Sequence, residues 1–251
     1  MFELTITQFS ITILVMYHIT TLADSLYLHR HWAHHHIKLH KSVVWFFEFW
    51  LWFISGSQDP EIGRMHRYHH QTVDTDKDPH SPWVLGKKAI LWNMPINHTL
   101  KCLSRLLTDT FKNSKEGIGK HPFDEYPEVF LFSFKMPNVG MFLFLSLSVI
   151  LFGLGDGILF FLINLFSVWF HQQTFGFGLN HLIGYRNYDS DDKSRNVLPW
   201  AIIFGGEDLH NNHHTHSGRV NFAHKWFEFD IGYMYIKILN KLGLCEIISK
   251  E

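Results

Sequence analysis

The sequence predicts an all-α integral membrane protein, in which a bundle of spanning helices carries a cytosolic helical cap. Three observations predict it: uncharged segments of membrane-spanning length, Lys and Arg confined to the chain outside them, and His clusters beside the predicted membrane boundary. With 251 residues the chain is long enough for one domain, and 1–251 is predicted to be one. The net charge of -1 excludes the basic excess that nucleic-acid-binding proteins show.

Three helices are predicted to cross the bilayer, over about 4–23, 137–154 and 157–178. The first contains no Asp, Glu, Lys or Arg, and roughly 20 such residues span the hydrocarbon core of a membrane. The second and third are predicted to form a helical hairpin whose tight turn is the Gly-Asp-Gly sequence around Asp156.

The apolar segment 42–58 is predicted to lie at the interface or against the protein, because Glu48 in its middle would be costly in lipid. This choice places 24–136 and 180–251 on one side of the membrane, with the His clusters. The positive-inside rule makes that side cytoplasmic, in a bacterial inner membrane or the endoplasmic reticulum. The stretch 84–134, with mixed charge and several Pro, is predicted to form short helices and loops.

Histidines in spaced sets carry the strongest chemical signal among the 20 His of the chain. The sets are HRHWAH at 29–34, HRYHH at 66–70 and HNNHH at 210–214, and His181 lies near the end of the last predicted crossing. On an α-helix, the first and last His of H-x-x-H-H share a face, while the middle His is turned away by roughly 60 to 100°. One helical turn can therefore serve two metals. Imidazole suits Zn, Cu, Fe and Ni, so the ligand type leaves the metal open.

Carboxylates near these sets are predicted to support the imidazoles. Neutral imidazoles leave the charge of a metal uncompensated, and nearby carboxylates can accept the second ring N–H of a ligand. The candidates for this role are Asp74, Asp78, Glu207 and Asp208. A carboxylate-bridged di-iron bundle is disfavoured, because only Glu207-Asp-Leu-His210 has the Glu-x-x-His spacing.

For the first His set, the spacing alone does not decide which two His residues lie on the same face. His31 and His35 form an i,i+4 pair, whereas His29 and His34 are five apart and about 140° out of phase on an α-helix. Helix geometry alone therefore favours His31 and His35.

The order of the motifs closely resembles that of the membrane-bound fatty acyl desaturases of the stearoyl-CoA (delta-9) type. The motifs are HRHWAH, HRYHH followed by DTDKDPHSP, NHLIGYRNYDSDDKSRN, HNNHH and WFEFDIGY, and the resemblance runs over about residues 10–240. It implies a helical membrane bundle under a cytosolic cap, with two iron ions (Fe²⁺) and O2 as co-substrate. The nine ligands that it implies are His29, His34, His66, His69, His70, His181, His210, His213 and His214.

The resemblance also carries expectations for single residues. It selects His29 and His34 over the alternative pair, and it implies that Arg64 contacts an anionic acyl-carrier head group. Family members usually have an Asn four residues before the lone His, where this chain has Phe177, and Asn180 is the nearest amide. Iron occupancy or activity is expected to depend on this change from Asn to Phe. The family commonly has two crossings before its first His set, whereas this chain has room for one. The N-terminus is therefore expected to face the outside, unless the start is abbreviated or a partner replaces the first helix.

The activity that the resemblance implies is O2-dependent introduction of a cis double bond, by family default delta-9, into a saturated fatty acyl chain, by default acyl-CoA. No haem, flavin or iron–sulfur motif appears, so a separate cytochrome b5- or ferredoxin-like donor with its reductase is expected. A di-iron fatty acyl or alkyl hydroxylase is the nearest alternative. A non-enzymatic His-rich metal-binding or transport protein is the second, although only His18 and His171 lie within the predicted crossings, where transport requires ligands.

Overall fold

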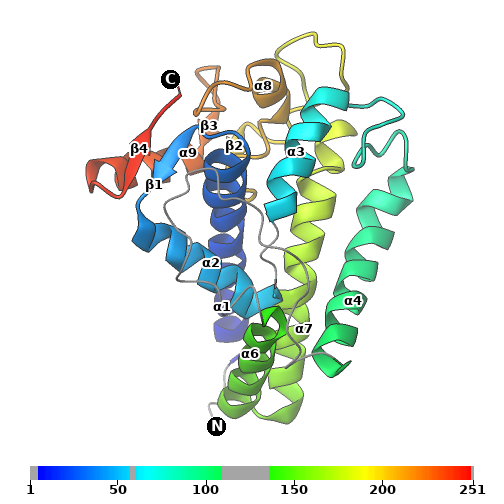
Figure 1. Ribbon diagram of the computed structural model, residues 1–251, viewed down its shortest axis with the longest axis vertical. Coiled ribbons are helices and arrows are strands. Elements are labelled where there is room, and N and C mark those ends of the chain that lie inside the picture. Colours follow the sequence, from blue (N-terminus) through cyan, green and yellow to red (C-terminus); the bar gives the residue numbers. More distant parts are fainter. Residues whose placement is uncertain (1–4, 57–59, 109–135, 250–251) are drawn as a thin grey trace.

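The computed structural model describes residues 5–56, 60–108 and 136–249, and these are mostly helical (Figure 1). Two helices run side by side along the long axis, α1 (Ile6–Leu22) and α7 (Leu154–Phe170), and α6 (Pro137–Phe152) packs against α7 at the end near the N-terminus. Large apolar side chains such as Ile6, Leu14 and Ile150 are exposed on these helices. Such surfaces suit contact with lipid.

Both long helices continue beyond their α-helical parts into π-helical turns, and the second one then into a 3₁₀ turn. α1 passes into a π-helix, η1 (Ala23–Ala33), and α7 passes into a second one, η3 (His171–Phe175), followed by a 3₁₀ turn, η4 (Leu179–His181). Over their full lengths these two rods, 6–33 and 154–181, are long and apolar enough to cross a membrane. Each rod therefore extends from the apolar part of the molecule into a segment with candidate metal ligands.

The turn between α6 and α7 lies at Gly153, three residues before the Asp156 predicted for it. Gly153 has φ 85°, which a residue with a Cβ adopts only at a cost, whereas 155–157 form the first turn of α7. Gly157 serves helix packing instead: a Cβ there would lie 2.5 Å from the Cα of Val149 on α6. The predicted helical hairpin is therefore present, but its turn was predicted at the wrong residues. α6 is an apolar helix shorter than the two rods, so a third crossing stays a prediction.

The helix α2 (Lys41–Ser55) packs across α6, and Figure 1 shows it oblique to α1. His40 caps its N-terminus by accepting from Ser42 N, and Gly56 ends it in a left-handed conformation. The buried Glu48 carboxylate accepts a 2.6 Å hydrogen bond from the Tyr27 hydroxyl of η1. The carboxylate in the middle of this apolar helix is thus held against the protein.

The end of the molecule opposite the α6–α7 turn carries α3 (Pro60–Thr72) and α8 (His210–Thr215), which bear the second and third His sets (Figure 1). From there η2 (Ala89–Asn93) leads into α4 (Met94–Thr108), a continuous helix that packs on α7 where short helices and loops were predicted. Residues 109–134 of that prediction lie outside the described residues.

The cap is not wholly helical, contrary to the sequence-based prediction. Besides α9 (Ile231–Lys241), it contains the antiparallel pair β1 (Ile37–Leu39) with β4 (Cys245–Ile247) and the parallel pair β2 (Trp200–Ala201) with β3 (Phe229–Asp230). Within 187–196, Asp192 accepts from Ser194 N at 3.0 Å, a local side-chain bond that favours a turn over a helix. The Asn211 side chain of α8 holds the same segment by accepting from Tyr188 N and donating to the Tyr188 carbonyl.

A fully buried Arg30 joins η1 to the cap. Its guanidinium donates to Asp230 at 2.8 Å and to the Val220 carbonyl at 3.1 Å, and it lies 3.8 Å from the centre of the Phe222 ring. Removing one partner of such a buried pair costs roughly 3–5 kcal/mol, because the other charge is left uncompensated. Arg30 therefore fixes the cap on the helix that carries the first His set.

Candidate metal centre

The nine predicted ligands converge in two adjoining groups. Their ring nitrogens lie within 4.8 Å of one another in each group. The five-histidine group consists of His29, His34, His66, His70 and His213. The four-histidine group consists of His69, His181, His210 and His214.

The second and third His sets divide between the groups in opposite ways. On α3, His66 and His70 belong to the five-histidine group and His69 to the other. On α8, the first and last His, His210 and His214, belong to the four-histidine group, and His213 crosses over. The i,i+4 pairs thus stay together, as one helical turn requires, and each middle His serves the opposite group.

The first His set reaches the centre because η1 is a π-helix. The His34 N–H donates to the His29 carbonyl at 3.0 Å, an i→i+5 bond, and the two rings lie 4.8 Å apart. His31 turns away, with its Nδ1 3.0 Å from the Ile37 carbonyl oxygen, and His35 lies beyond the helix with φ 55°. The α-helical register that favoured His31 and His35 is therefore wrong, because the local helix is wider.

Ring nitrogens face one another in both groups. Nε2 to Nε2 separations are 3.1 Å for His29 and His213, 3.0 Å for His34 and His66, and 3.1 Å for His181 and His210. Burial is the main cause that lowers the pKa of His34, His66, His70, His210, His213 and His214, so these rings are neutral at pH 7.

Such an arrangement fits a bound cation. Neutral imidazoles have one donor and one acceptor nitrogen, so several converging Nε2 atoms cannot all satisfy one another. The buried Nε2 atoms of His69 and His214 have no hydrogen-bond partner among the described residues. Lone pairs that converge in this way are the donor set of an imidazole-bound transition metal.

Four carboxylates orient the rings through the opposite nitrogen, Nδ1. Glu207 lies 2.6 Å from His29, Asp78 2.9 Å from His69, Asp74 3.0 Å from His181, and Asp192 3.1 Å from His214. A proton on Nδ1 leaves Nε2 free as a ligand. The four-histidine group has three of these carboxylates and the five-histidine group has one.

These four carboxyl groups are ionised at neutral pH. Burial acts to raise their pKa values, but hydrogen bonds and neighbouring charges outweigh it, and the pKa values of Asp74, Asp78, Asp192 and Glu207 are lowered. A negatively charged carboxylate therefore lies beside each of the rings of His29, His69, His181 and His214.

Of these four, Asp192 was not predicted from the sequence. It lies 22 residues before its partner His214, a separation that no local motif reports. The Asp-Ser-Asp-Asp run at 189–192 was the available signal.

Neither Asp208 nor Asn180 hydrogen-bonds to one of the nine rings among the described residues, and the role predicted for Arg64 stays a prediction. Asp208 is buried, which raises its pKa to about 8, and it accepts no hydrogen bond from the nine rings. Asn180 Nδ2 lies 3.5 Å from the Glu207 carbonyl oxygen, and its buried Oδ1 has no hydrogen-bond partner among the described residues. The backbone of Arg64 belongs to α3, and its side chain lies outside the described residues. The Phe177 ring stacks on His80 with 3.8 Å between ring centres.

No protein-family model matches the chain. Curated relatives do match over most of its length. The chain is 28% identical to delta-9 acyl-lipid desaturase 1 of Arabidopsis thaliana, with 92% of this chain and 72% of the relative covered. It is 30% identical to sn-1 stearoyl-lipid 9-desaturase of Synechocystis sp., covering 74% of this chain and 54% of the relative. These relatives, at 25–30% identity over most of the chain, support a delta-9 desaturase-type family for it.

The names of the desaturases that match the chain give different bond positions and different acyl carriers. Icosanoyl-CoA 5-desaturase of Limnanthes douglasii is 25% identical, with 89% of this chain and 60% of the relative covered. Its name gives a coenzyme A thioester and position 5, whereas the Arabidopsis name gives an acyl lipid and position 9. Similarity to these desaturases therefore leaves both the bond position and the acyl carrier open.

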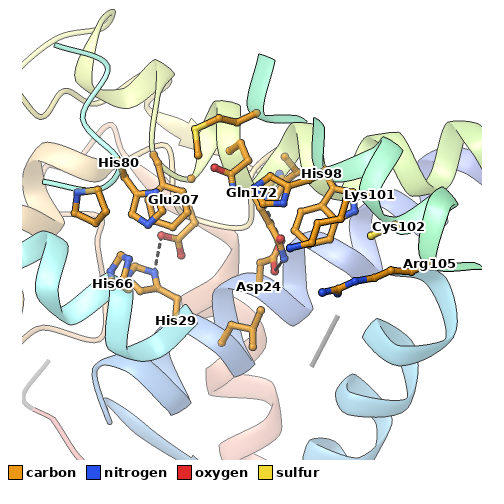
Figure 2. A pocket seen from close by; sticks show the side chains of 18 residues that line it. Asp24, His29, His66, His80, His98, Lys101, Cys102, Arg105, Gln172 and Glu207 are labelled. Atoms are coloured by element: carbon orange, nitrogen blue, oxygen red, sulfur yellow. Dashed lines mark hydrogen bonds and ion pairs between the residues drawn. The ribbon is translucent and has the colours of Figure 1, made fainter. Parts of the chain in front are cut away.

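A cavity of about 450 Å³ adjoins the five-histidine group at His29 and His66 (Figure 2). Figure 2 shows His29, His66 and Glu207 on one side of it and the α4 side chains Lys101 and Arg105 on the other. Apolar side chains line it as well, among them Leu28, Trp169 and Phe177. Its volume lies in the range of small-molecule binding sites, roughly 300–1,000 Å³.

Proposed function

We propose that the chain is an O2-dependent di-iron desaturase that introduces a cis double bond into a saturated fatty acyl chain. The observation that carries this proposal is the convergence of nine buried or partly buried imidazoles in two groups, in a chain whose relatives are acyl desaturases. The proposed ligands of one iron are the five-histidine group, and those of the other are the four-histidine group.

Iron supplies the oxidising power in this proposal. Iron held by the two histidine groups would supply, with O2 and two electrons, the reactivity needed for the loss of two hydrogens from adjacent methylenes, whose C–H bonds have no acidity that a base could use. The overall change is loss of two hydrogens from the acyl chain and reduction of O2, with two electrons and two protons, to two waters. The electrons are proposed to come from a separate cytochrome b5- or ferredoxin-like protein with its reductase.

In this proposal, the residues of the protein orient the ligand rings and bind the acyl chain. Asp74, Asp78, Asp192 and Glu207 hold protons on the Nδ1 atoms of their partners, which keeps each Nε2 directed at the metal position. The cavity beside His29 and His66 is proposed to hold the acyl chain, and its walls keep the reacting methylenes next to the five-histidine group.

The substrate and the location are the family defaults. We propose delta-9 as the bond position and acyl-CoA as the carrier, with Arg64 contacting the head group, and lipid-linked acyl chains as the alternative that several relatives' names suggest. The centre is proposed to face the cytoplasm, beneath a bacterial inner membrane or the endoplasmic reticulum. Two helices long and apolar enough to cross a membrane support a membrane location.

Lipid profiling of cells that express the chain with a suitable electron donor tests the proposal. Wild type is expected to raise monounsaturated acyl content, and His69→Ala and His213→Ala, one from each group, are expected to abolish the rise. His40→Ser is the matched control, because His40 lies outside both groups and Ser can retain the N-cap of α2. An unchanged profile from iron-loaded wild type would reject the proposal, and a hydroxylated product would assign the chain to the hydroxylases instead.

A further inference from the structure

The cap has a cluster of exposed apolar side chains, here called the interfacial patch. It lies in the part of the chain that the sequence assigned to the cytoplasm. Trp226 is 95% exposed and Trp200 is 67% exposed, values rare for the largest apolar side chain. The patch consists of Trp200, Ile202, Ile203, Trp226, Phe227 and Phe229.

The short sheet of the cap directs two of these side chains outward together. Trp200 and Phe229 are partners in the parallel β2–β3 pair. Their neighbours Ala201 and Asp230 are buried on the opposite face of the sheet. Since side chains alternate between the faces of a strand, Trp200 and Phe229 project from the same outer face.

Contacts with the two long apolar helices fix the depth of the segment that carries Ile202 and Ile203. The Ser25 hydroxyl donates to the Gly205 carbonyl at 2.7 Å, and a Cβ on Gly205 would lie 2.9 Å from the Thr21 carbonyl oxygen. The Phe204 ring lies 6.1 Å from the His171 ring. The segment next to Ile202 and Ile203 therefore crosses the molecule at the level where the α-helical parts of both apolar rods end.

We infer that the interfacial patch inserts into the interfacial region of the bilayer that surrounds α1 and α7. Trp is enriched at membrane–water interfaces because its ring is apolar and its indole N–H is polar. Lys225, exposed next to Trp226, is placed to meet lipid phosphates. Ile202 and Ile203 of the patch lie next to the level at which the α-helical parts of the membrane helices end, which is the reason for assigning the patch to lipid and not to a soluble partner.

Membrane insertion of the patch holds the cap at a fixed height. Arg30 and the Ser25–Gly205 contact already join the cap to η1, and the patch gives it a second attachment to the membrane itself. The two histidine groups then keep a constant distance from the bilayer. This inference does not depend on the reaction that the centre catalyses.

Site-directed spin labelling of the full chain in phosphatidylcholine vesicles tests it. Ile203→Cys and Trp226→Cys are labelled with a nitroxide, since both native cysteines are buried. We expect these labels to collide more often with O2, which partitions into lipid, than with a water-soluble nickel complex. Gly218→Cys is the control, because a Cβ there meets no atom within 4 Å and Gly218 comes three residues after α8, the helix that Figure 1 shows at the end of the molecule opposite α6. Its label should show the reverse preference.

Two outcomes would overturn the inference. Labels at 203 and 226 that collide with nickel as readily as the control would place the patch in water, and labels shielded from both reagents would place it under protein. A second measurement uses unlabelled protein: brominated phosphatidylcholine should quench wild-type tryptophan fluorescence more than that of Trp226→Phe. Equal quenching of the two proteins would also contradict insertion.

Discussion

Replacing Asp78 by Asn tests whether the carboxylates support metal binding. Both carboxylate oxygens lie within 3.0 Å of His69 Nδ1. Loss of such a partner typically lowers metal affinity 10–100-fold, which corresponds to about 1.4–2.7 kcal/mol. A hydrogen bond to a charged group contributes about 1.5–3 kcal/mol, so two independent routes give the same magnitude. We therefore expect the four-histidine group of Asp78→Asn to release iron to a chelator at 10–100-fold lower chelator concentration than wild type.

Asp78 also accepts backbone N–H groups from Asp74 and His80, so Asn should lower the thermal midpoint as well. Chelator titration followed by the iron content of purified protein separates affinity from stability. Asp76→Asn is the matched control, since Asp76 is exposed in the same turn and the change removes the same charge. Wild-type iron retention by Asp78→Asn, or equal loss in Asp76→Asn, would refute the reasoning.

Further substitutions address the supports of the centre. Arg30→Gln should lower stability by about 3–5 kcal/mol, because Asp230 loses its buried partner, and an unchanged thermal midpoint would contradict this. Gly206→Ala should cost about 1–3 kcal/mol, since Gly206 has φ 103° and a Cβ would lie 2.3 Å from Asp230 Oδ1; circular dichroism on heating measures it. His34→Ala should lose iron, whereas His31→Ala should keep iron and lose only stability, by about 1–3 kcal/mol. Equal iron loss in the two His variants would show that the π-helical register is not the functional one.

The sequence predicted which His residues converge more successfully than it predicted the local helix geometry that brings them together. The i,i+4 spacing of His66 and His70 predicted a shared face, and the structure places both in one group. The same reasoning failed for His29 and His34, because sequence patterns do not report a π-helix. An i→i+5 helix forms where tertiary contacts over-determine it, here around the buried Arg30.

Features that depend on distant contacts were not predictable from local patterns. Asp192 meets His214 only after the 187–196 turns fold over α8, and the strands of the cap pair residues remote in sequence, such as Trp200 and Phe229. In contrast, the α6–α7 hairpin was predicted because its glycines are local signals. Its turn was misplaced because one of them, Gly157, serves helix packing.

The two histidine groups differ in their surrounding charge, and this difference is testable. Three carboxylates face the four-histidine group, whereas Glu207 alone faces the other, and Arg30 lies 3.4 Å from Glu207. Since Glu207 and Asp78 orient ligands of different groups, Glu207→Gln and Asp78→Asn should each lose about one iron per chain under the same chelator, from opposite groups. The double variant should lose both, and Mössbauer spectra of the single variants should show different remaining sites. If either single variant released both irons together, the groups would act as one cooperative site, and the division into five and four ligands would have no meaning for metal binding.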